Sequence, residues 1–424
     1  MDKIGKYEVL RKLGEGATSE VFLCHDPFNN RDVAAKVVFE ERLRDAETGK
    51  LAKKLFITEA SLAGKLIHPH IVQIYDAVVS DTLSYIVMEY VTGGTLERFC
   101  DPRNLLPIDK TVEIIFKCSR ALNFANDLGV THRDIKPANL LLTEEMDIKI
   151  SDFGAALMTS TDQTQVTGIG SPAYMSPQQI KEQPLDQRTD IYSLGVVMYQ
   201  LLTGSLPFQA SNNFSMMYQI TNVEPPLPSE YRKDIPLSVD EIVRKAMQKE
   251  LDRRYASWSE FSFDLAEAFR NEQLSSRTPE VADTEKFNTM RSLSFFATFT
   301  DAELWEIMRI SRWDNLTAAS IVIQDGDAGD FFCILASGQV KVTKRKKLLN
   351  VLSPGECFGE MAYLSEAGHV RSADVTTLSD AQIMRIKNDD LERASVACRH
   401  RFDRAFMGLL VERLSLANTR LTSV

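Results

Sequence analysis

The sequence predicts an α+β protein, in which a small sheet and a helical lobe are followed by a β-roll with flanking helices. Residues 7–40 alternate polar and apolar side chains, a pattern typical of a hairpin followed by a third strand. From about residue 108 the apolar residues recur at helical spacing instead. After about residue 286 short strand-like runs return, separated by turn signals such as Asp325-Gly326.

The first part of the chain is expected to form two lobes with a cleft between them. Residues 53–67 have the apolar spacing of a helix, and HIVQIYDAVV and LSYIVMEYV follow as two more strand-like runs. The later segments with helical spacing are 108–125, 190–203, 238–248 and 259–270.

The rear part is expected to form a β-roll, or jelly-roll, between a short helix and a C-terminal amphipathic helix. The predicted helices cover 301–311 and the residues from about 400, and the predicted strands are 320–324, 331–336, 339–343, 348–352 and 381–386. Segment 271–285 is polar and lacks periodicity, which indicates a linker. The predicted domains are therefore 1–270, divided into lobes 1–91 and 92–270, then linker 271–285, then 286–424.

The composition excludes several classes of protein. Among 424 residues, 44% are apolar and 25% are charged, as in ordinary globular domains, and the net charge of -10 argues against a nucleic-acid partner. The basic run 344–347 is interpreted as a solvated strand end or turn. The six cysteines form no CxxC pair, so neither zinc nor disulfides are indicated. No run of 18 apolar residues occurs, which favours a cytoplasmic protein without a membrane partner.

A glycine-containing loop lies between two strand patterns. In LGEGATSEV, Gly14 and Gly16 would let the backbone close over a triphosphate and present N–H groups to it. Ser19 stands where a full G-x-G-x-x-G motif has its third glycine. A hairpin turn explains two such glycines equally well, so the loop by itself is weak support.

Lys36 lies inside the apolar strand VAAKVV, where an ammonium group needs a partner. Glu59, in the middle of the next predicted helix, is the expected partner. Lys36 could then contact the phosphates of a nucleotide. The alternative is a lysine that extends to the surface.

Two further strings supply the groups that phosphoryl transfer needs. THRDIKPANLLL contains Asp134, which can orient a substrate hydroxyl, Lys136, which can neutralise the transferred group, and Asn139, an amide ligand for Mg²⁺. KISDFGAAL follows an apolar strand and offers the carboxylate of Asp152 to the same metal.

This ordered set resembles the signature of the eukaryotic-like serine/threonine protein kinases over residues 7–270. The resemblance implies a two-lobed protein kinase fold that transfers the γ-phosphate of ATP to Ser or Thr of a protein substrate. It implies ATP and Mg²⁺ as cofactors, with Mn²⁺ as an alternative metal. It also implies that Lys36, Glu59, Asp134 and Lys136 are catalytic and that Asn139 and Asp152 hold the metal. The implied ATP-binding residues are Leu13, Gly14, Gly16, Val21, Ala34, Lys36, Met88, Glu89 and Val91.

The same resemblance assigns supporting roles. Asp190 would hold the loop that carries Asp134, and Arg133 would meet a phosphate in the segment 152–178. Thr161, Thr164 and Thr167 are the candidate phosphorylation sites, with Thr167 as the first choice.

Two residues depart from the family pattern. Gln178 stands where the family has a glutamate that pairs with an arginine, here expected to be Arg254. An amide keeps a hydrogen bond but loses the charge, so a less stable lower lobe is expected. Ala138 replaces the glutamate of kinases that prefer arginine before the target residue.

Segment 353–375 resembles the phosphate-binding cassette of cyclic nucleotide-binding domains, and the likeness extends over residues 287–424. Phe358, Gly359 and Glu360 match one end of the cassette, and Arg371, Ser372 and Ala373 match the other. The resemblance implies that Arg371 binds a cyclic phosphate and that Glu360 accepts from a ribose hydroxyl. The 11-residue spacing between them is slightly longer than in the family. The alternatives are that these two residues pair with each other or that the roll holds no ligand.

The sequence as a whole therefore predicts a protein kinase that is regulated by cAMP or cGMP, with the choice of nucleotide left open. Two other functions remain possible. One is a pseudokinase scaffold, favoured by Gln178 and Ser19. The other is a cyclic-nucleotide-responsive interaction module that forms a homodimer through its C-terminal helix.

Overall fold

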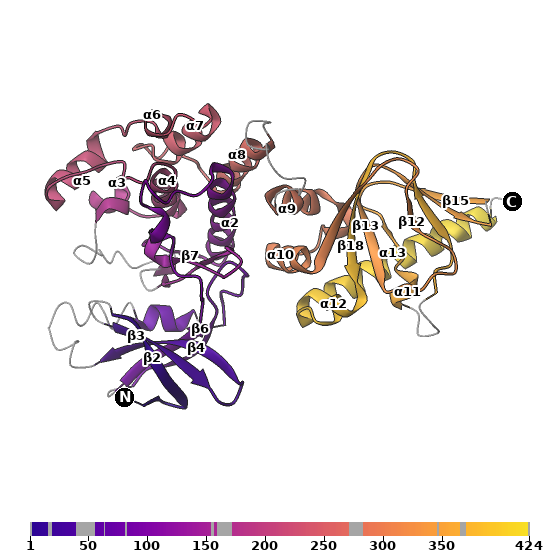
Figure 1. Ribbon diagram of the computed structural model, residues 1–424, viewed down its shortest axis with the longest axis horizontal. Coiled ribbons are helices and arrows are strands. Elements are labelled where there is room, and N and C mark those ends of the chain that lie inside the picture. The colour runs from indigo at the N-terminus through magenta and orange to yellow at the C-terminus, as the bar shows by residue number, and fades with distance from the viewer. Residues whose placement is uncertain are drawn as a thin grey trace. The chain divides into compact units, whose positions relative to one another are not determined.

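The computed structural model describes residues 2–15, 19–39, 56–62, 64–80, 83–153, 157–158, 172–270, 283–345, 347–364 and 370–422. The chain divides into two compact units, Met1–Pro279 and Glu280–Val424, which are coloured indigo to rose and orange to yellow in Figure 1. Both units combine helices and sheets, which confirms the predicted α+β class.

The first unit begins with a six-stranded antiparallel sheet of order β1-β2-β3-β4-β6-β5. One face of this sheet packs around the buried rings of Tyr7 and Tyr85. The other face carries Val38 and Ile86, which pack against Phe56 of the helical residues 56–61. The strands are β1 (Lys3–Ile4), β2 (Tyr7–Glu15), β3 (Ser19–Asp26), β4 (Arg31–Phe39), β5 (Ile74–Val78) and β6 (Leu83–Glu89).

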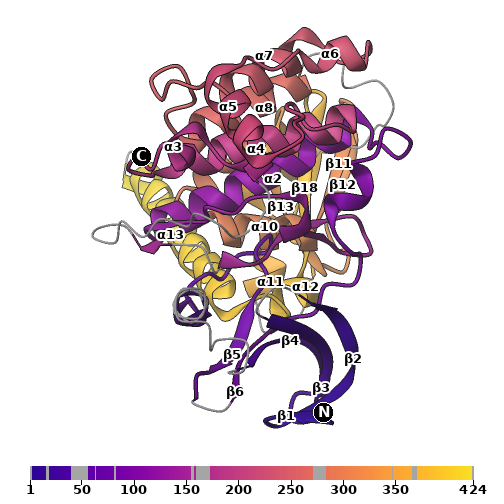
Figure 2. The same cartoon turned by 90° about the vertical axis from the view of Figure 1, so that its left-hand side faces the viewer.

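Helices make up most of the rest of this unit, and Figure 2 shows strands β2, β3 and β4 curving below them. Helix α4 (Gln187–Thr203) is buried over nearly its whole length, as a central helix should be. Around it lie α2 (Ile108–Asp127), α3 (Pro177–Ile180), α5 (Asn213–Asn222), α6 (Pro228–Tyr231), α7 (Leu237–Ala246) and α8 (Trp258–Arg270).

Short strands and 3₁₀ turns connect this helical part to the sheet. The pairs β7–β10 and β8–β9 are both antiparallel. The elements are η2 (Leu96–Phe99), β7 (Val130–Thr131), η3 (Pro137–Asn139), β8 (Leu140–Leu142), β9 (Ile148–Ile150), β10 (Leu157–Met158) and η5 (Pro172–Tyr174).

The second unit is a roll of two four-stranded sheets, with orders β11-β18-β13-β16 and β12-β17-β14-β15. Apolar side chains from both sheets form its core, among them Leu335, Val340 and Ile383. The strands are β11 (Ser311–Leu316), β12 (Ile321–Ile323), β13 (Phe331–Ser337), β14 (Val340–Lys344), β15 (Lys347–Leu352), β16 (Cys357–Phe358), β17 (Asp374–Thr377) and β18 (Ala381–Lys387).

Helices flank the roll on its N- and C-terminal sides. Rings of Phe402 and Phe406, from the last helix, pack against Phe332 of the roll. The helical elements are α9 (Asp283–Ser292), η6 (Ser294–Phe296), α10 (Asp301–Ile310), α11 (Met361–Leu364), α12 (Asn388–Glu392) and α13 (Val396–Thr422).

The structure differs from the expected elements in several places. Helix α9 begins at Asp283, inside the predicted linker, and residues 271–282 lie outside the described residues. Strands β11, β16 and β17 were not predicted, and α13 begins at Val396 instead of near residue 400. None of the helices in the described part of the chain combines the length and apolar character that a membrane crossing requires.

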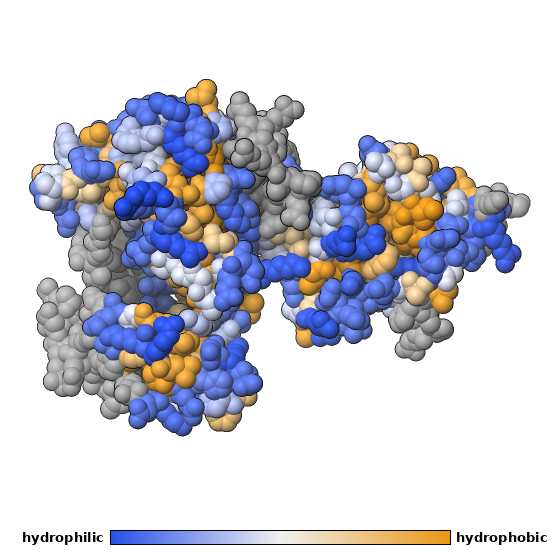
Figure 3. Space-filling view, viewed as in Figure 1, coloured by the Kyte–Doolittle hydropathy of each residue, from blue (hydrophilic) through white to orange (hydrophobic). Residues whose placement is uncertain are grey.

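The surface in Figure 3 mixes hydrophilic and apolar residues on both units. Exposed apolar residues of the roll are found on β12 and β15, and include Ile321, Leu348 and Leu349. The charged residues of the candidate active site lie on other elements, in the first unit.

Candidate active site and ligand site

Three charged residues from distant parts of the first unit meet at one ammonium group. Lys36 Nζ on β4 donates to Glu59 Oε2 of the helical residues 56–61 at 2.8 Å. It also donates to Asp152 Oδ1, just after β9, at 2.8 Å. The sequence therefore brings a strand, a helix and a loop together around one lysine.

This cluster keeps Lys36 and Asp152 charged. Burial works against the ammonium form of Lys36, but the two carboxylates outweigh it and raise its pKa above the usual value. Burial likewise opposes ionisation of Asp152, but Lys36 outweighs it and lowers the pKa of that carboxyl. For Glu59, which is more deeply buried, desolvation dominates and raises the pKa.

Asp134, Lys136 and Asn139 form a second cluster on the loop that follows β7. Lys136 Nζ donates to Asp134 Oδ2 at 2.7 Å. Asn139 Nδ2 donates to the backbone oxygen of Asp134 at 2.8 Å and to its Oδ2 at 3.1 Å. The Asp134 side chain is 42% exposed, so a hydroxyl group from solvent or from a second molecule can reach it.

Asp190, near the start of α4, holds this loop in its bent form. Its carboxylate accepts from the backbone N–H of His132 at 2.6 Å and of Arg133 at 2.7 Å. Arg133 has a φ of 67°, a conformation that is uncommon for a residue with a side chain and needs such support. His132 also connects the two clusters, because its Nε2 lies 2.9 Å from the backbone oxygen of Ser151.

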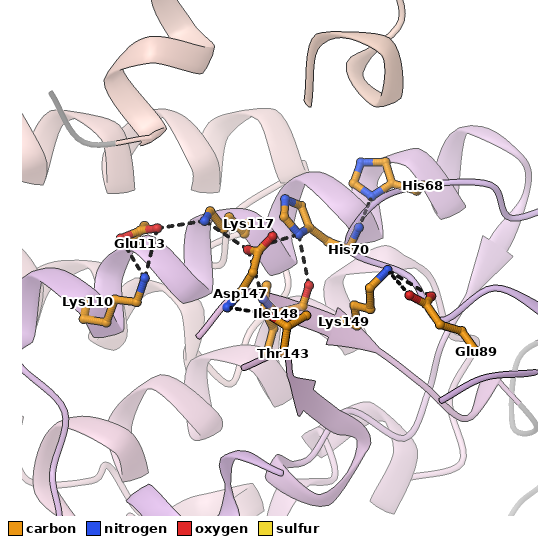
Figure 4. A network of polar contacts seen from close by, with 10 residues as sticks. All are labelled: His68, His70, Glu89, Lys110, Glu113, Lys117, Thr143, Asp147, Ile148 and Lys149. Carbon is orange, nitrogen blue, oxygen red and sulfur yellow. Dashed lines mark hydrogen bonds and ion pairs between the residues drawn. The ribbon is translucent and has the colours of Figure 1, made fainter. Parts of the chain in front are cut away.

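Strand β9, which leads to Asp152, is held from both sides. The backbone of Ile150 donates to His70 and accepts from Val72, while β8 pairs with its other edge. At the start of the strand, Asp147 accepts from the buried Lys117 at 3.0 Å (Figure 4). These contacts fix the direction in which the chain enters the Asp152 turn.

Lys149, in the middle of β9, was not singled out from the sequence. Its Nζ lies 2.8 Å from Glu89 Oε1 at the end of β6, so it joins the strand before Asp152 to one of the expected ATP-binding residues. The backbone N–H of Glu89 donates to the backbone oxygen of Gln73. The backbone group of Glu89 that could bind a ligand is therefore its carbonyl oxygen.

Four of the other residues that the resemblance assigns to ATP, Gly14, Val21, Ala34 and Met88, share one face of the sheet. Val21, Lys36 and Ile86 are cross-strand neighbours, and Gly14 pairs with Val21 at the end of the row. Ala34 pairs with Met88 two residues along, on the same face. Leu13 and Val91 lie at the ends of this region, in β2 and just after β6, and Gly16 lies outside the described residues. A flat apolar face next to Lys36 suits an aromatic base with phosphates attached.

Gln178 makes two hydrogen bonds in the helical part of the first unit. Its Oε1 accepts from Arg254 Nη2 at 2.9 Å, and its Nε2 donates to the backbone oxygen of Lys249 at 2.9 Å. The hydrogen bond that was expected between Gln178 and Arg254 is therefore present. Burial lowers the pKa of Arg254 to about 10, because the guanidinium contacts carbonyl oxygens and the Tyr192 ring instead of a carboxylate.

In the second unit, the two ends of the predicted cassette meet at Arg371. Its Nη1 donates to the backbone oxygen of Gly359 at 3.0 Å, and its Nη2 donates to that of Phe331 at 2.7 Å. Gly359 has a φ of +80°, and a Cβ there would lie 2.9 Å from Arg371 Nη1. Only glycine therefore lets the backbone come this close to the guanidinium.

Arg371 is 5% exposed and forms no ion pair with any of the described residues. Burial lowers the pKa of its guanidinium, and the carboxylates of Asp330 and Asp327 oppose this from a longer range. A buried cation whose contacts are two carbonyl oxygens and an aromatic ring is costly unless an anion joins it. Such an arrangement could bind an anion.

The remaining cassette residues surround this site. Phe358 and Glu360 are buried, whereas Ser372 is exposed and Ala373 is partly exposed. No ion pair joins Glu360 to Arg371 within the described part of the unit. The candidate phosphorylation sites Thr161, Thr164 and Thr167 lie outside the described residues.

Comparison with known families gives two matches, in agreement with this geometry. Residues 7–263 match the protein kinase domain, and residues 313–396 match the cyclic nucleotide-binding domain. Because the first match covers more than half of the chain, the chain belongs to the protein kinase family. Its rear unit carries a cyclic nucleotide-binding domain by the same comparison.

Curated relatives resemble the first unit. The serine/threonine-protein kinase PknB of Mycobacterium leprae is 38% identical over 267 residues, which are 61% of this chain and 42% of that protein. PknB of Mycobacterium tuberculosis is 35% identical over 296 residues, 68% of this chain and 46% of the relative. A Clostridium acetobutylicum protein named "Probable serine/threonine-protein kinase" is 34% identical over 268 residues, 63% of this chain and 40% of the relative. The chain thus spans less than half the length of these relatives.

Proposed function

We propose that the first unit transfers the γ-phosphoryl group of ATP to Ser or Thr hydroxyls of a protein substrate. The observation that carries this proposal is the meeting of Lys36, Glu59 and Asp152 beside the cluster of Asp134, Lys136 and Asn139. Relatives that share about 35–38% of the residues are named as serine/threonine-protein kinases, which supports the same substrate class.

The residues divide the chemical work. Lys36, oriented by Glu59, binds the phosphates nearest to the nucleoside. Asp134 orients the attacking hydroxyl and accepts its proton, and Lys136 neutralises charge on the transferred group. The carboxylate of Asp152 and the amide oxygen of Asn139 are hard donors that fit Mg²⁺, with Mn²⁺ as the alternative. When bound, the metal supplies charge stabilisation for the phosphates.

Phosphorylation of a general protein substrate with γ-labelled ATP tests this function. Asp134→Asn and Asp152→Asn should each reduce kcat by about 100-fold or more, because the first removes the group that accepts the hydroxyl proton and the second removes a ligand for the metal. Asp234→Asn, at an exposed ion pair with Arg232, is the matched control and should retain activity. Equal labelling by wild type and both site variants would leave the pseudokinase scaffold as the remaining explanation.

We further propose that the second unit binds a cyclic nucleotide and that binding regulates the first. The buried Arg371, without a carboxylate partner in the described residues, supports an anionic ligand, and the family match supports the nucleotide. Glu360, close to Gly359, is the candidate acceptor for a ribose hydroxyl. Calorimetric titration of the full chain with cAMP and with cGMP tests binding, and an Arg371→Met variant should abolish it.

Regulation is tested separately by the kcat/KM of the full chain with and without a saturating cyclic nucleotide. A ligand shifts an equilibrium only by its difference in affinity for the two states, so a 100-fold effect requires about 2.7 kcal/mol of coupling. Unchanged kcat/KM with both nucleotides would rule out regulation while leaving kinase activity intact.

We also propose that Thr161, Thr164 or Thr167, with Thr167 preferred, becomes phosphorylated and binds Arg133. Arg133 Nε is buried and has no hydrogen-bond partner among the described residues, and desolvation lowers the pKa of this guanidinium. A phosphate would supply the missing acceptor. Mass spectrometry of the purified chain after incubation with ATP identifies the modified residue.

A further inference from the structure

Phe331, the first residue of β13, contacts two guanidinium groups in the roll. The central carbon of Arg371 lies 4.3 Å from the Phe331 ring centroid, and that of Arg385 lies 4.4 Å from it. The backbone oxygen of Phe331 also accepts from Arg371 Nη2. One residue therefore orients the anion-binding arginine through both its ring and its backbone.

Arg385, on β18, is fixed from its other end by Asp314 of β11. Arg385 Nη2 lies 3.0 Å from Asp314 Oδ2, while the second oxygen, Oδ1, lies 3.1 Å from Arg312 Nε. The Asp314 side chain is 15% exposed and that of Arg312 is 83% exposed. Asp314 thus divides its charge between the exposed Arg312 and the less exposed Arg385.

The two arginines of the roll act on each other as like charges. The nearby Arg385 lowers the pKa of Arg371, in the same direction as burial. Only Asp314 forms an ion pair with either of them among the described residues, and it reaches Arg385 alone. Two guanidinium groups therefore lie next to the Phe331 ring. Because both are largely shielded from water, their charges would act strongly on a bound anion.

We infer that Arg385 is a second cationic residue of the anion site, positioned by Asp314 and coupled to Arg371 through the Phe331 ring. This inference rests on the proposed binding of a cyclic phosphodiester by Arg371. Arg385 raises the affinity for the monoanion by its charge, Asp314 limits that effect, and Phe331 keeps the Arg371 guanidinium at the correct angle. Arg385 is a positioning residue and needs no direct contact with the ligand.

Three variants of the full chain test the charges by calorimetric titration with cAMP and cGMP. Arg385→Met should weaken binding about threefold to tenfold, as expected for loss of one charge near the site in a medium of intermediate dielectric constant. Asp314→Asn should strengthen binding by a similar factor, because it leaves Arg385 uncompensated. Arg312→Met removes the exposed arginine from the same carboxylate and should leave the affinity unchanged.

The opposite signs separate this role from a structural one, since simple loss of packing would weaken binding in every variant. Phe331→Leu should also weaken binding, and Phe331→Tyr, which keeps the ring, should restore it. Thermal melting of each variant confirms that the roll is folded. Equal affinities in Arg385→Met and wild type, or weaker binding by Asp314→Asn, would overturn the inference. If the wild-type chain bound neither nucleotide, the proposed anion site itself would fail, and this inference with it.

Discussion

The amide nitrogen of Gln178 makes a hydrogen bond that the family's glutamate could not make. In place of the family's glutamate, the amide accepts from Arg254 and donates to the backbone oxygen of Lys249. A carboxylate could make only the first contact and would place a negative charge against the carbonyl oxygen of Lys249. The sequence predicted that Gln178 would make the lower lobe less stable. The hydrogen bond from its amide nitrogen offsets part of that expected loss.

We expect Gln178→Glu to change the free energy of unfolding by less than about 1 kcal/mol. The gain of an ion pair with the buried Arg254 is offset by desolvation of the new carboxylate and by loss of the donated hydrogen bond. Gln178→Ala, which removes both contacts, should cost about 2–3 kcal/mol. Chemical denaturation of the wild type and both variants measures the difference. Stabilisation of more than 2 kcal/mol by the glutamate would contradict this account.

Lys249 is a buried titratable group of the first unit that was not singled out from the sequence. Its Nζ lies 4.4 Å from the Phe208 ring centroid and has no hydrogen-bond partner among the described residues. Burial lowers its pKa from 10.5 to about 8, and the more distant Glu224 opposes this only in part. The Lys249 amine is therefore less readily protonated in the folded protein than in the unfolded chain.

Between pH 8 and 10.5 the unfolded chain binds more protons at Lys249 than the folded chain, so the stability contribution of this group rises with pH. Below pH 8 the charged form is present in both states and its burial is a constant penalty. We expect Lys249→Met to melt at a higher temperature than wild type at pH 7, and the difference to disappear toward pH 10.5. The exposed Lys233→Met serves as the control, and a difference that is constant with pH would contradict the prediction.

At the scale of elements, helix α2 and strand β9 are joined by a buried ion cluster. Lys117 of α2 lies 2.8 Å from Glu113 Oε1 and 3.0 Å from Asp147 Oδ1, with 5% of its side chain exposed. We expect Lys117→Met to destabilise the first unit by about 3–5 kcal/mol, because Asp147 then loses its lysine partner, while Glu113 retains its contact with Lys110.

The double variant Lys117→Met with Asp147→Asn should recover part of this loss, since it removes one of the two charges. Thermal melting measures both effects. Because β9 leads to Asp152, kcat should fall with the single variant even at temperatures where the unit remains folded. Unchanged melting of the Lys117→Met chain would show that the cluster contributes little.

The sequence predicted elements well where a local pattern was long enough. The run 33–38 lies inside β4, and the motif residues Asp134, Lys136 and Asn139 came from one short string. Strand β16 has only two residues, too few for periodicity to indicate anything. Lys149 and Arg385 could not be recognised, because their partners Glu89 and Phe331 are reached only through strand registers formed between distant segments.

At the scale of the whole molecule, the proposed regulation requires energetic coupling between two compact units, Met1–Pro279 and Glu280–Val424. Each unit has its own apolar core and its own charged cluster. Coupling is then a property of the full chain, and it must act in both directions.

Reciprocity gives the sharpest test of that coupling. If a saturating cyclic nucleotide changes the affinity of the full chain for a non-hydrolysable ATP analogue with Mg²⁺ by some factor, the analogue must change the affinity for the cyclic nucleotide by the same factor. We expect a factor of about 5 to 150, the usual range for allosteric proteins. Calorimetric titration of each ligand in the presence and absence of the other measures both values on one sample.

An Arg371→Met chain should still bind the ATP analogue but lose the effect, because the anion site is gone while the Lys36 cluster is untouched. If both ligands bind and neither alters the affinity of the other, ligand binding in the two units is not energetically coupled. Any effect of the nucleotide on activity would then have to come from the rate of phosphoryl transfer alone.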